Sequence, residues 1–239
     1  MESAAQAGHV EAQRELGWMY YNGKGTSQDH QQASAWLLRA AEQGDAAAQN
    51  TLGFLYAGGW GVEKDAAKAV YWYRKAAVQG LAVAQTNLGD KYRSGEGVEQ
   101  DDSQAVYWYR KAAQQSYANA QHWLGYAYKT GRGVARDYAE AVRWYRLAAD
   151  QGFSNAQSEL GVMYKEGWGV KRDYARARHW YERAVELDHG PAFYNLGKLY
   201  EYGLGVNKDE DRAVELYREA ARRGRKSAQE ELRKRGLSW

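Results

Sequence analysis

A Leu-Gly pair recurs along the chain at a constant interval of 36 residues. The pairs begin at Leu16, Leu52, Leu88, Leu124, Leu160 and Leu196. Each pair is followed, in the same register, by a Tyr, a Gly-x-Gly segment, an Asp and, in five of the six copies, a Trp. Self-similarity at a fixed period of this length indicates a repeat protein, in which each copy forms one supersecondary unit.

The residues of each copy predict two helices joined by the glycine segment. In AVAQTNLGDKYRS, Ala84, Leu88 and Tyr92 fall four residues apart and therefore share one helical face. The Gly-x-Gly segment ends that helix because Gly adopts the left-handed conformation without a Cβ penalty. The Asp that follows is the expected N-cap of the second helix. That helix carries the apolar stripe of AVYWYRKAA, which includes Trp108 and Tyr109.

The glycine of each Leu-Gly pair falls inside a predicted helix, where Gly costs roughly 1 kcal/mol relative to Ala. We expect a close approach of helices at the Trp and Tyr positions to offset this cost. The Trp residues, and the Tyr after most of them, recur in register, so we expect them to form the core rather than a ligand site. The same expectation applies to the first-helix Tyr column, from Tyr20 to Tyr200.

One pair of helices cannot bury its own apolar stripe, whereas stacked pairs can. The pattern therefore predicts an all-α fold, a right-handed α-solenoid of six 36-residue helix-turn-helix repeats with a partial repeat at each end. We see no linker and no low-complexity segment, and expect a single solenoid over residues 1–239. The expected units are about 9–44, 45–80, 81–116, 117–152, 153–188 and 189–224, with a C-terminal capping helix at 225–239.

The consensus A-x-A-Q-x-x-L-G-x-x-Y…G-x-G-V…D…A-x-x-W-Y-r-x-A-A-x-x-G resembles the Sel-1-like repeat, a relative of the tetratricopeptide repeat. One copy in this chain is AVAQTNLGDKYRSGEGVEQDDSQAVYWYRKAAQQS. The resemblance covers nearly the whole chain and departs from the pattern near its ends, for example at Thr26 and Leu216. It implies a mostly non-enzymatic adaptor that binds a protein on the repeat surface, and it does not identify the partner.

Composition and motifs limit the chemistry that this chain carries. It has no Cys, which excludes disulfides, zinc-thiolate sites and Cys nucleophiles. Its five His residues form no H-E-x-x-H motif, and neither G-x-S-x-G nor a phosphate-binding loop motif occurs. The Gly-x-Gly segments lack a preceding strand, so we interpret them as helix-ending loops. The sequence predicts no catalytic residue, no metal site and no cofactor.

Positions that vary between copies are the candidates for partner binding. By analogy with tetratricopeptide arrays, the first helices line a concave groove, and Trp also occupies the middle of two Gly-x-Gly loops. Aromatic residues and Arg carry much of the binding energy of protein interfaces. Packing against a neighbouring loop is the alternative for the two loop Trp residues. The predicted partner-binding residues are Trp18, Tyr21, Phe54, Trp60, Arg93, His122, Trp123, Tyr126, Lys129, Arg132 and Trp168.

The ends of the chain allow further expectations. The basic segment from Arg222 to Arg235 is interpreted as a solvated capping helix, with a phosphate- or acid-binding patch as the alternative. No basic stripe follows the repeats, so a nucleic-acid partner is not expected, and no apolar run approaches the length of a membrane span. The chain begins within a repeat, so we expect that a secretory signal or a further repeat preceded Met1.

Three functions remain open from the sequence. The first is a bacterial adaptor or scaffold, as the resemblance implies. The second is an inhibitor, such as an immunity protein that binds and neutralises a secreted toxic enzyme, for example a lipase. An enzyme is the remote third alternative. We expect a monomer in either the periplasm or the cytoplasm.

Overall fold

The computed structural model describes residues 1–239 and contains fourteen helices and no strand. The helices are α1 (Glu2–Gln6), α2 (Val10–Asn22), α3 (His30–Glu42), α4 (Ala46–Gly58), α5 (Ala66–Val78), α6 (Ala82–Ser94), α7 (Asp102–Gln114), α8 (Ala118–Thr130), α9 (Tyr138–Asp150), α10 (Ser154–Glu166), α11 (Tyr174–Glu186), α12 (Gly190–Tyr202), α13 (Glu210–Arg222) and α14 (Lys226–Lys234). None of them combines the length and the apolar character that crossing a membrane requires. The predicted all-α fold with two helices in each of six repeats is confirmed.

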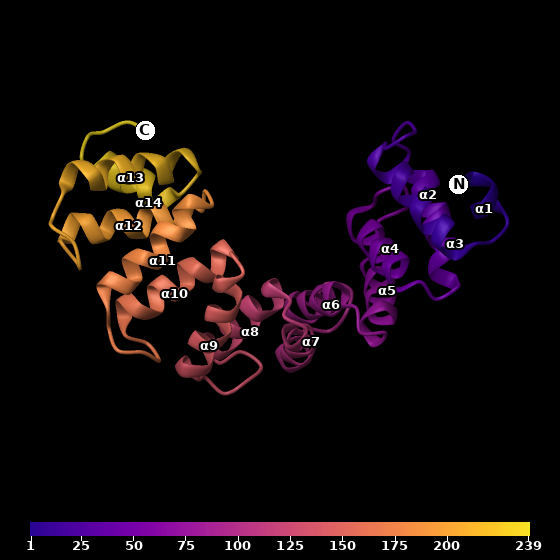
Figure 1. Cartoon of the computed structure of the whole chain (residues 1–239), viewed down its shortest axis with the longest axis horizontal. Coiled ribbons are helices and arrows are strands. Elements are labelled where there is room, and N and C mark those ends of the chain that lie inside the picture. Colours follow the sequence, from indigo (N-terminus) through magenta and orange to yellow (C-terminus); the bar gives the residue numbers. More distant parts are fainter. The chain divides into compact units, whose positions relative to one another are not determined.

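The chain forms two compact units, which we describe separately. Unit 1 contains residues 1–120 and 132–134, and unit 2 contains residues 121–131 and 135–239. Within unit 1, α2 packs on α3, α3 on α4, and so on to α7 (Figure 1). Within unit 2, the helices from α9 to α14 follow the same order. Packing between consecutive helix pairs is the arrangement of a solenoid.

The glycine of each Leu-Gly pair makes room for a large side chain of the second helix. A Cβ atom placed on Gly53 would lie 2.8 Å from the ring of Tyr73, and one placed on Gly161 would lie 2.5 Å from the ring of Tyr181. The two rings are 3% and 0% exposed, so the surrounding core holds them in place. The predicted close approach is confirmed, and it involves the Tyr of the second helix rather than the Trp.

From the second copy onward, the second glycine of the Gly-x-Gly loop lies against the repeat before it. Gly97 has a φ of +79°, which favours glycine. A Cβ atom placed on it would lie 2.2 Å from the carbonyl oxygen of Ala66, the first residue of α5. In unit 2, Gly169 makes the same close approach to Tyr138 at the start of α9. The loop therefore sets the spacing of successive repeats within each unit.

The predicted Asp N-caps are confirmed in all six second helices. Asp101, for example, accepts hydrogen bonds from the backbone N–H groups of Ser103 and Gln104 at 2.9 and 3.0 Å. Such bonds satisfy donors that have no partner within the helix. The capping column comprises Asp29, Asp65, Asp101, Asp137, Asp173 and Asp209.

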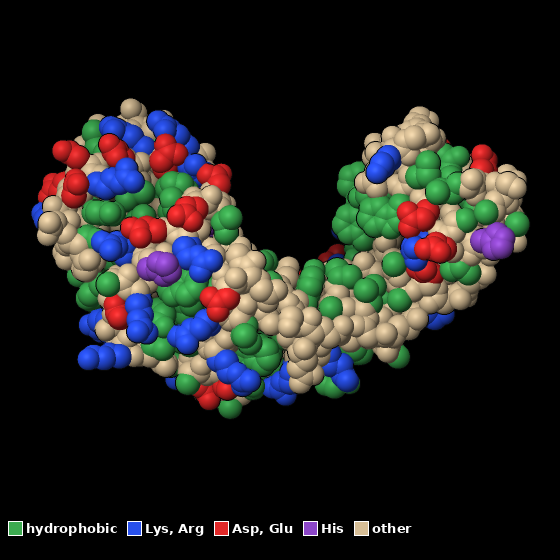
Figure 2. All heavy atoms as spheres, in the orientation of Figure 1, with side chains coloured by type: hydrophobic (Ala, Val, Ile, Leu, Met, Phe, Trp, Pro, Cys, Tyr) green, Lys and Arg blue, Asp and Glu red, His purple; other side chains and the backbone are tan.

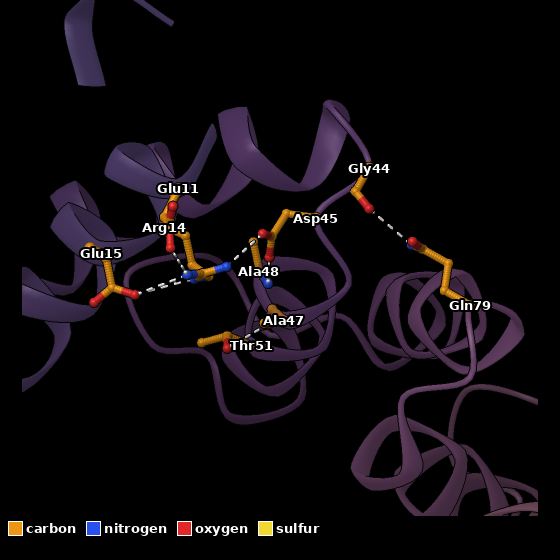
Figure 3. A network of polar contacts seen from close by, with 9 residues as sticks. All are labelled: Glu11, Arg14, Glu15, Gly44, Asp45, Ala47, Ala48, Thr51 and Gln79. Carbon is orange, nitrogen blue, oxygen red and sulfur yellow. Dashed lines mark hydrogen bonds and ion pairs between the residues drawn. The ribbon is translucent and has the colours of Figure 1, made fainter. Parts of the chain in front are cut away.

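Gln side chains form a ladder of hydrogen bonds between successive helices. Gln85 donates to the carbonyl oxygen of Ala77 at 3.1 Å, and its Oε1 accepts from Gln115 Nε2 at 2.9 Å. Gln79 makes the equivalent bond to Gln49 at 2.8 Å and also donates to the carbonyl oxygen of Gly44 (Figure 3). The ladder satisfies buried amides and the carbonyl ends of helices together.

At one step of this ladder in unit 2 a Gln lacks its partner, which leads to a stability prediction. Leu187 occupies the ladder position and is 50% exposed, while the buried Oε1 of Gln157 has no partner. Leu187→Gln should raise the free energy of unfolding by about 1 kcal/mol because it supplies the missing donor. Urea denaturation measures this change. Leu187→Ala, which removes the exposed side chain without adding a donor, should not show the gain, and an equal gain there would contradict the prediction.

Two expectations about packing were wrong in part. The first-helix Tyr column is half-buried except at Tyr164, which is 3% exposed, rather than forming core throughout. These rings lie at the edge of the core, where Arg side chains reach their hydroxyls; Arg74 donates to Tyr92 at 2.8 Å.

The capping helix α14 covers residues 226–234 and not 225–239, because Gly236 has a φ of +68° and ends it.

Candidate functional site

Four of the predicted residues lie in one connected aromatic cluster in unit 1. Trp18 and Tyr21 of α2 pack edge to face with ring centroids 5.7 Å apart, and Tyr21 packs in the same way on Phe54 of α4 at 6.2 Å. Tyr21 also contacts His30 at 5.3 Å, and His30 contacts Trp60 of the loop after α4 at 5.3 Å. We call these five residues the aromatic surface.

The aromatic surface is open to solvent although its rings support one another. Trp18, Phe54 and Trp60 are 39%, 44% and 46% exposed, while Tyr21 and His30 are half-buried between them. Figure 2 shows hydrophobic side chains gathered over this part of unit 1. Edge-to-face contacts fix the orientation of aromatic rings. A connected, exposed apolar patch on a folded domain marks an interaction site.

A glycine positions Trp60 within this surface. A Cβ atom placed on Gly58, the last residue of α4, would lie 2.1 Å from Nε1 of Trp60, so the indole occupies space that only Gly leaves free. The corresponding residue before Trp168 is Glu166. Trp168 stacks on Tyr138, which corresponds to His30, with centroids 5.4 Å apart and 14° between the ring planes, whereas Trp60 meets His30 edge to face. The two loop Trp residues therefore differ in setting, although both side chains are exposed.

His30 is the member of the aromatic surface that the sequence prediction missed. It directly follows the N-cap Asp29, and the backbone at this position touches the loop of the next repeat, as the close approach of Gly61 to His30 shows. The corresponding residues in two other copies, Tyr138 and Tyr174, are also aromatic. That column was the signal that could have identified the contact between His30 and Trp60.

A second group of predicted residues lies on α8 in unit 2, and one of them is not at the surface. His122 is 9% exposed and packs against Trp123, Tyr145 and Phe153, with ring centroids between 5.4 and 5.6 Å away. We therefore leave His122 out of the proposed binding surface. Trp123 and Tyr126 are half-buried and meet edge to face at 5.7 Å.

Burial of His122 leads to a prediction about pH. The pKa of His122 is lowered from 6.5 to about 4 because burial disfavours the imidazolium, and the charges of Lys129 and His189 act in the same direction. The unfolded chain therefore takes up a proton that the folded chain resists, and stability should fall as pH drops from about 6.5 through 4. The loss attributable to this group is at most about 3 kcal/mol. Urea denaturation across this range should show a smaller loss for His122→Phe than for wild type, and equal losses would contradict the prediction.

The predicted cationic residues already have partners. Lys129 pairs with Glu159 at 2.6 Å, and Arg132 places two nitrogens 3.1 and 3.2 Å from the carboxylate of Asp102. Arg93 donates to the hydroxyl of Tyr109 at 3.2 Å. A binding partner would have to compete for these groups, so the exposed aromatic side chains offer the more accessible contacts.

The other polar clusters are part of the framework. Arg14, one turn before Trp18 on α2, is held by Glu11, Glu15 and Asp45 (Figure 3). No three His, Asp or Glu side chains lie together in a way that could hold a metal ion.

Ion pairs also occupy part of the basic C-terminal segment. Arg222 pairs with Glu219, Arg223 pairs with Glu219 and Asp188, and Arg235 pairs with Glu201 and Glu231. Burial would raise the pKa of Glu201, but hydrogen bonds from Tyr217 and Lys198 and the positive charges of Lys198 and Arg235 hold it below its usual value. These contacts fit a capping helix better than an open anion-binding patch.

Comparison with known proteins places this geometry in a family context. The family model described as Sel1 repeat matches residues 10–45, 46–81, 82–117, 118–153, 154–189 and 191–224. Comparison with curated protein sequences gives no match.

Several solved structures are similar to the chain. The structure of c5321, a protective antigen of uropathogenic Escherichia coli strains with an SLR fold, is 41% identical with a TM-score of 0.89, and the match covers 95% of this chain and 49% of that one. The chain thus spans about half the length of the antigen. A Sel1 repeat protein from Oxalobacter formigenes is 40% identical with a TM-score of 0.85, and the match covers 90% of this chain and 84% of that one.

A more distant match shows the fold alone. The immunity protein Pa5087 from Pseudomonas aeruginosa is 22% identical to the chain, with a TM-score of 0.55. This match covers 89% of the chain and 81% of the immunity protein.

Proposed function

Because the chain belongs to the Sel1 repeat family, whose members are typically protein-interaction scaffolds, we propose that it binds a partner protein through the aromatic surface of unit 1. The observation that carries the proposal is the exposure of three large rings in one connected cluster. Large aromatic anchors dominate the binding energy of many interfaces. Since neighbouring rings already brace these side chains, little ordering cost opposes binding.

The remaining predicted residues contribute less in this proposal. Trp168 lies on a loop of unit 2 and is 37% exposed, but one face of its indole already stacks on Tyr138. Trp123 and Tyr126 are half-buried, so less of each ring is open to a partner than at the exposed rings of unit 1. We propose that the aromatic surface of unit 1 is the main binding site and that these three residues of unit 2 are weaker candidates for partner contacts.

Affinity capture from the native organism tests the proposal. The wild-type chain and a variant carrying Trp18→Ala, Phe54→Ala and Trp60→Ala are used as parallel baits. A protein captured in stoichiometric amount by the wild type and lost with the variant supports the proposed surface. A partner retained equally by both baits would contradict it.

The same experiment separates an adaptor from an inhibitor. The immunity-protein hypothesis draws only on distant relatives, the immunity proteins Pa5087 and PA5088, which are 22% and 18% identical to this chain. A captured secreted enzyme, such as a lipase, whose activity falls when it is bound would favour the inhibitor. A captured protein without such inhibition would favour the adaptor or scaffold, which is the role we propose.

A substitution at Gly58 can displace the Trp60 side chain without removing it. Gly58→Ala should weaken binding of the captured partner by about tenfold, because the added Cβ must displace the indole of Trp60. The free energy of unfolding should not fall, since Ala is the better helix former. Calorimetric titration and urea denaturation measure the two effects. The control is Ser94→Ala, at the position of the next repeat that corresponds to Gly58. Glu96 stands there in place of Trp60, so this exchange should leave the affinity unchanged.

A further inference from the structure

Four cationic side chains surround one cavity of unit 2 together with a single carboxylate. The cavity has a volume of about 480 Å³ and lies between α9, α10 and the loop that leads into α11. Four positive charges face one negative charge there, which leaves three positive charges uncompensated. The lining residues are Arg146, Tyr164, Val170, Lys171, Arg172, Asp173 and Arg176.

Two of the guanidinium groups converge on one oxygen atom. Arg146 donates to the hydroxyl oxygen of Tyr164 at 2.6 Å, and Arg176 donates to the same oxygen at 3.5 Å. Arg176 also pairs with Asp173 at 3.4 Å, but this carboxylate is committed to capping α11 as well. Neither Arg146 nor the exposed Arg172 takes part in an ion pair. Cations held close together without counter-charges raise the local affinity for anions.

The repeat itself does not require this charge. In the corresponding place of unit 1, Arg74 donates to Tyr92 at 2.8 Å, and the Val and the capping Asp are also retained. The three remaining cations, however, are replaced there by Glu99, Gln100 and Gln104. The Arg–Tyr hydrogen bond is thus common to both copies. The excess of positive charge occurs in the unit 2 copy and not in the unit 1 copy.

We propose that this cavity binds a phosphate group, either as free phosphate or on a phosphorylated side chain. A guanidinium group can donate two parallel hydrogen bonds to a phosphate. Such charge-assisted hydrogen bonds are stronger than those between neutral groups. A phosphate monoester carries nearly two negative charges at neutral pH and three acceptor oxygens, so it compensates the cavity better than a carboxylate does. The site lies in unit 2, so it goes beyond the proposed function of the aromatic surface in unit 1.

The test is a titration of the full chain with inorganic phosphate and, separately, with O-phosphoserine, at constant ionic strength. NMR signals of the Arg side-chain N–H groups report binding at each position. Saturable shifts are expected at Arg146 and Arg176, while Arg74 of unit 1 serves as the control in the same spectrum. Tighter binding of O-phosphoserine would identify a modified side chain as the ligand, and tighter binding of inorganic phosphate would identify free phosphate; either result supports the proposal.

A variant that copies the unit 1 residues provides the matched control. Lys171→Glu, Arg172→Gln and Arg176→Gln together should weaken phosphate binding at least about tenfold. The fold should be retained because unit 1 accommodates the same residues, and circular dichroism checks this. Should the triple variant unfold, the single exchange Lys171→Glu takes its place with a smaller expected loss.

Specific results would overturn the proposal. They are equal, non-saturating shifts at Arg74 and Arg176, or unchanged affinity in the folded variant. Tighter binding of acetate or of a single-stranded oligonucleotide would do the same, since the cavity would then select a carboxylate or a nucleic acid rather than a phosphate monoester.

Discussion

Gly97→Ala should lower the free energy of unfolding by at least about 3 kcal/mol. The residue has a φ of +79°, which costs an L-residue about 1–2 kcal/mol. The added Cβ would also lie 2.2 Å from the carbonyl oxygen of Ala66, and this backbone atom belongs to the first turn of a helix. Neither partner can move without separating two repeats, so strain and lost packing add together.

Gly80→Ala is the matched control for this prediction. Gly80 has an equally unusual φ of +94°, but a Cβ placed on it would meet no atom within 4 Å. It should therefore show the backbone cost alone, and urea denaturation of the two variants should separate the two contributions. Equal destabilisation by both exchanges would contradict the role of the loop glycine in spacing the repeats.

The triple exchange Trp18→Ala, Phe54→Ala and Trp60→Ala should reduce affinity for the captured partner at least about 100-fold. The exposed fractions of the three side chains, between 39% and 46%, mean that much of each ring is already in water. The free energy of unfolding should therefore fall by much less than for a buried aromatic residue, for which truncation costs about 3–5 kcal/mol. Calorimetric titration gives the affinity, and urea denaturation gives the stability.

Unit 1 contains a matched set of exposed apolar side chains outside the aromatic surface. Tyr71, Val78 and Tyr107 are 50%, 72% and 49% exposed. Their joint replacement by Ala removes a comparable amount of apolar surface and should leave affinity within about twofold of wild type. A similar loss of affinity in both triple variants would mean that binding depends on general surface hydrophobicity, contrary to the proposal.

Much of the fold could be predicted because the same physical constraint recurs in every copy. A Gly that faces Tyr73 or Tyr181 cannot acquire a side chain, and an Asp before a helix satisfies free N–H groups. These requirements are local or recur every 36 residues, so a single sequence is enough to detect them. Trp18, Tyr21 and Phe54 were selected as candidates by the same reasoning, since the choice depends on which positions of the first helices lie off the shared apolar face; their mutual contacts came from the structure.

Features that depend on contacts between particular copies could not be predicted in this way. His122 occupies a position whose residue type varies between copies, so its sequence does not reveal that it packs against Phe153 and is buried. The buried Thr86 and Ser158 at the same position of other copies show that this column faces inward. The contact of His30 with Trp60 has a counterpart in Tyr138 and Trp168, so comparison of the two copies is what could have revealed it.

Hydroxyl-radical footprinting of the chain, free and bound to its captured partner, tests the central claim most directly. It reports side-chain access to solvent at each aromatic residue in the unaltered protein. The account predicts that binding strongly protects Trp18, Phe54 and Trp60 from oxidation. Tyr71 and Tyr107 should be oxidised as fast as in the free chain. Unchanged labelling of the first three residues, with protection elsewhere, would contradict the account.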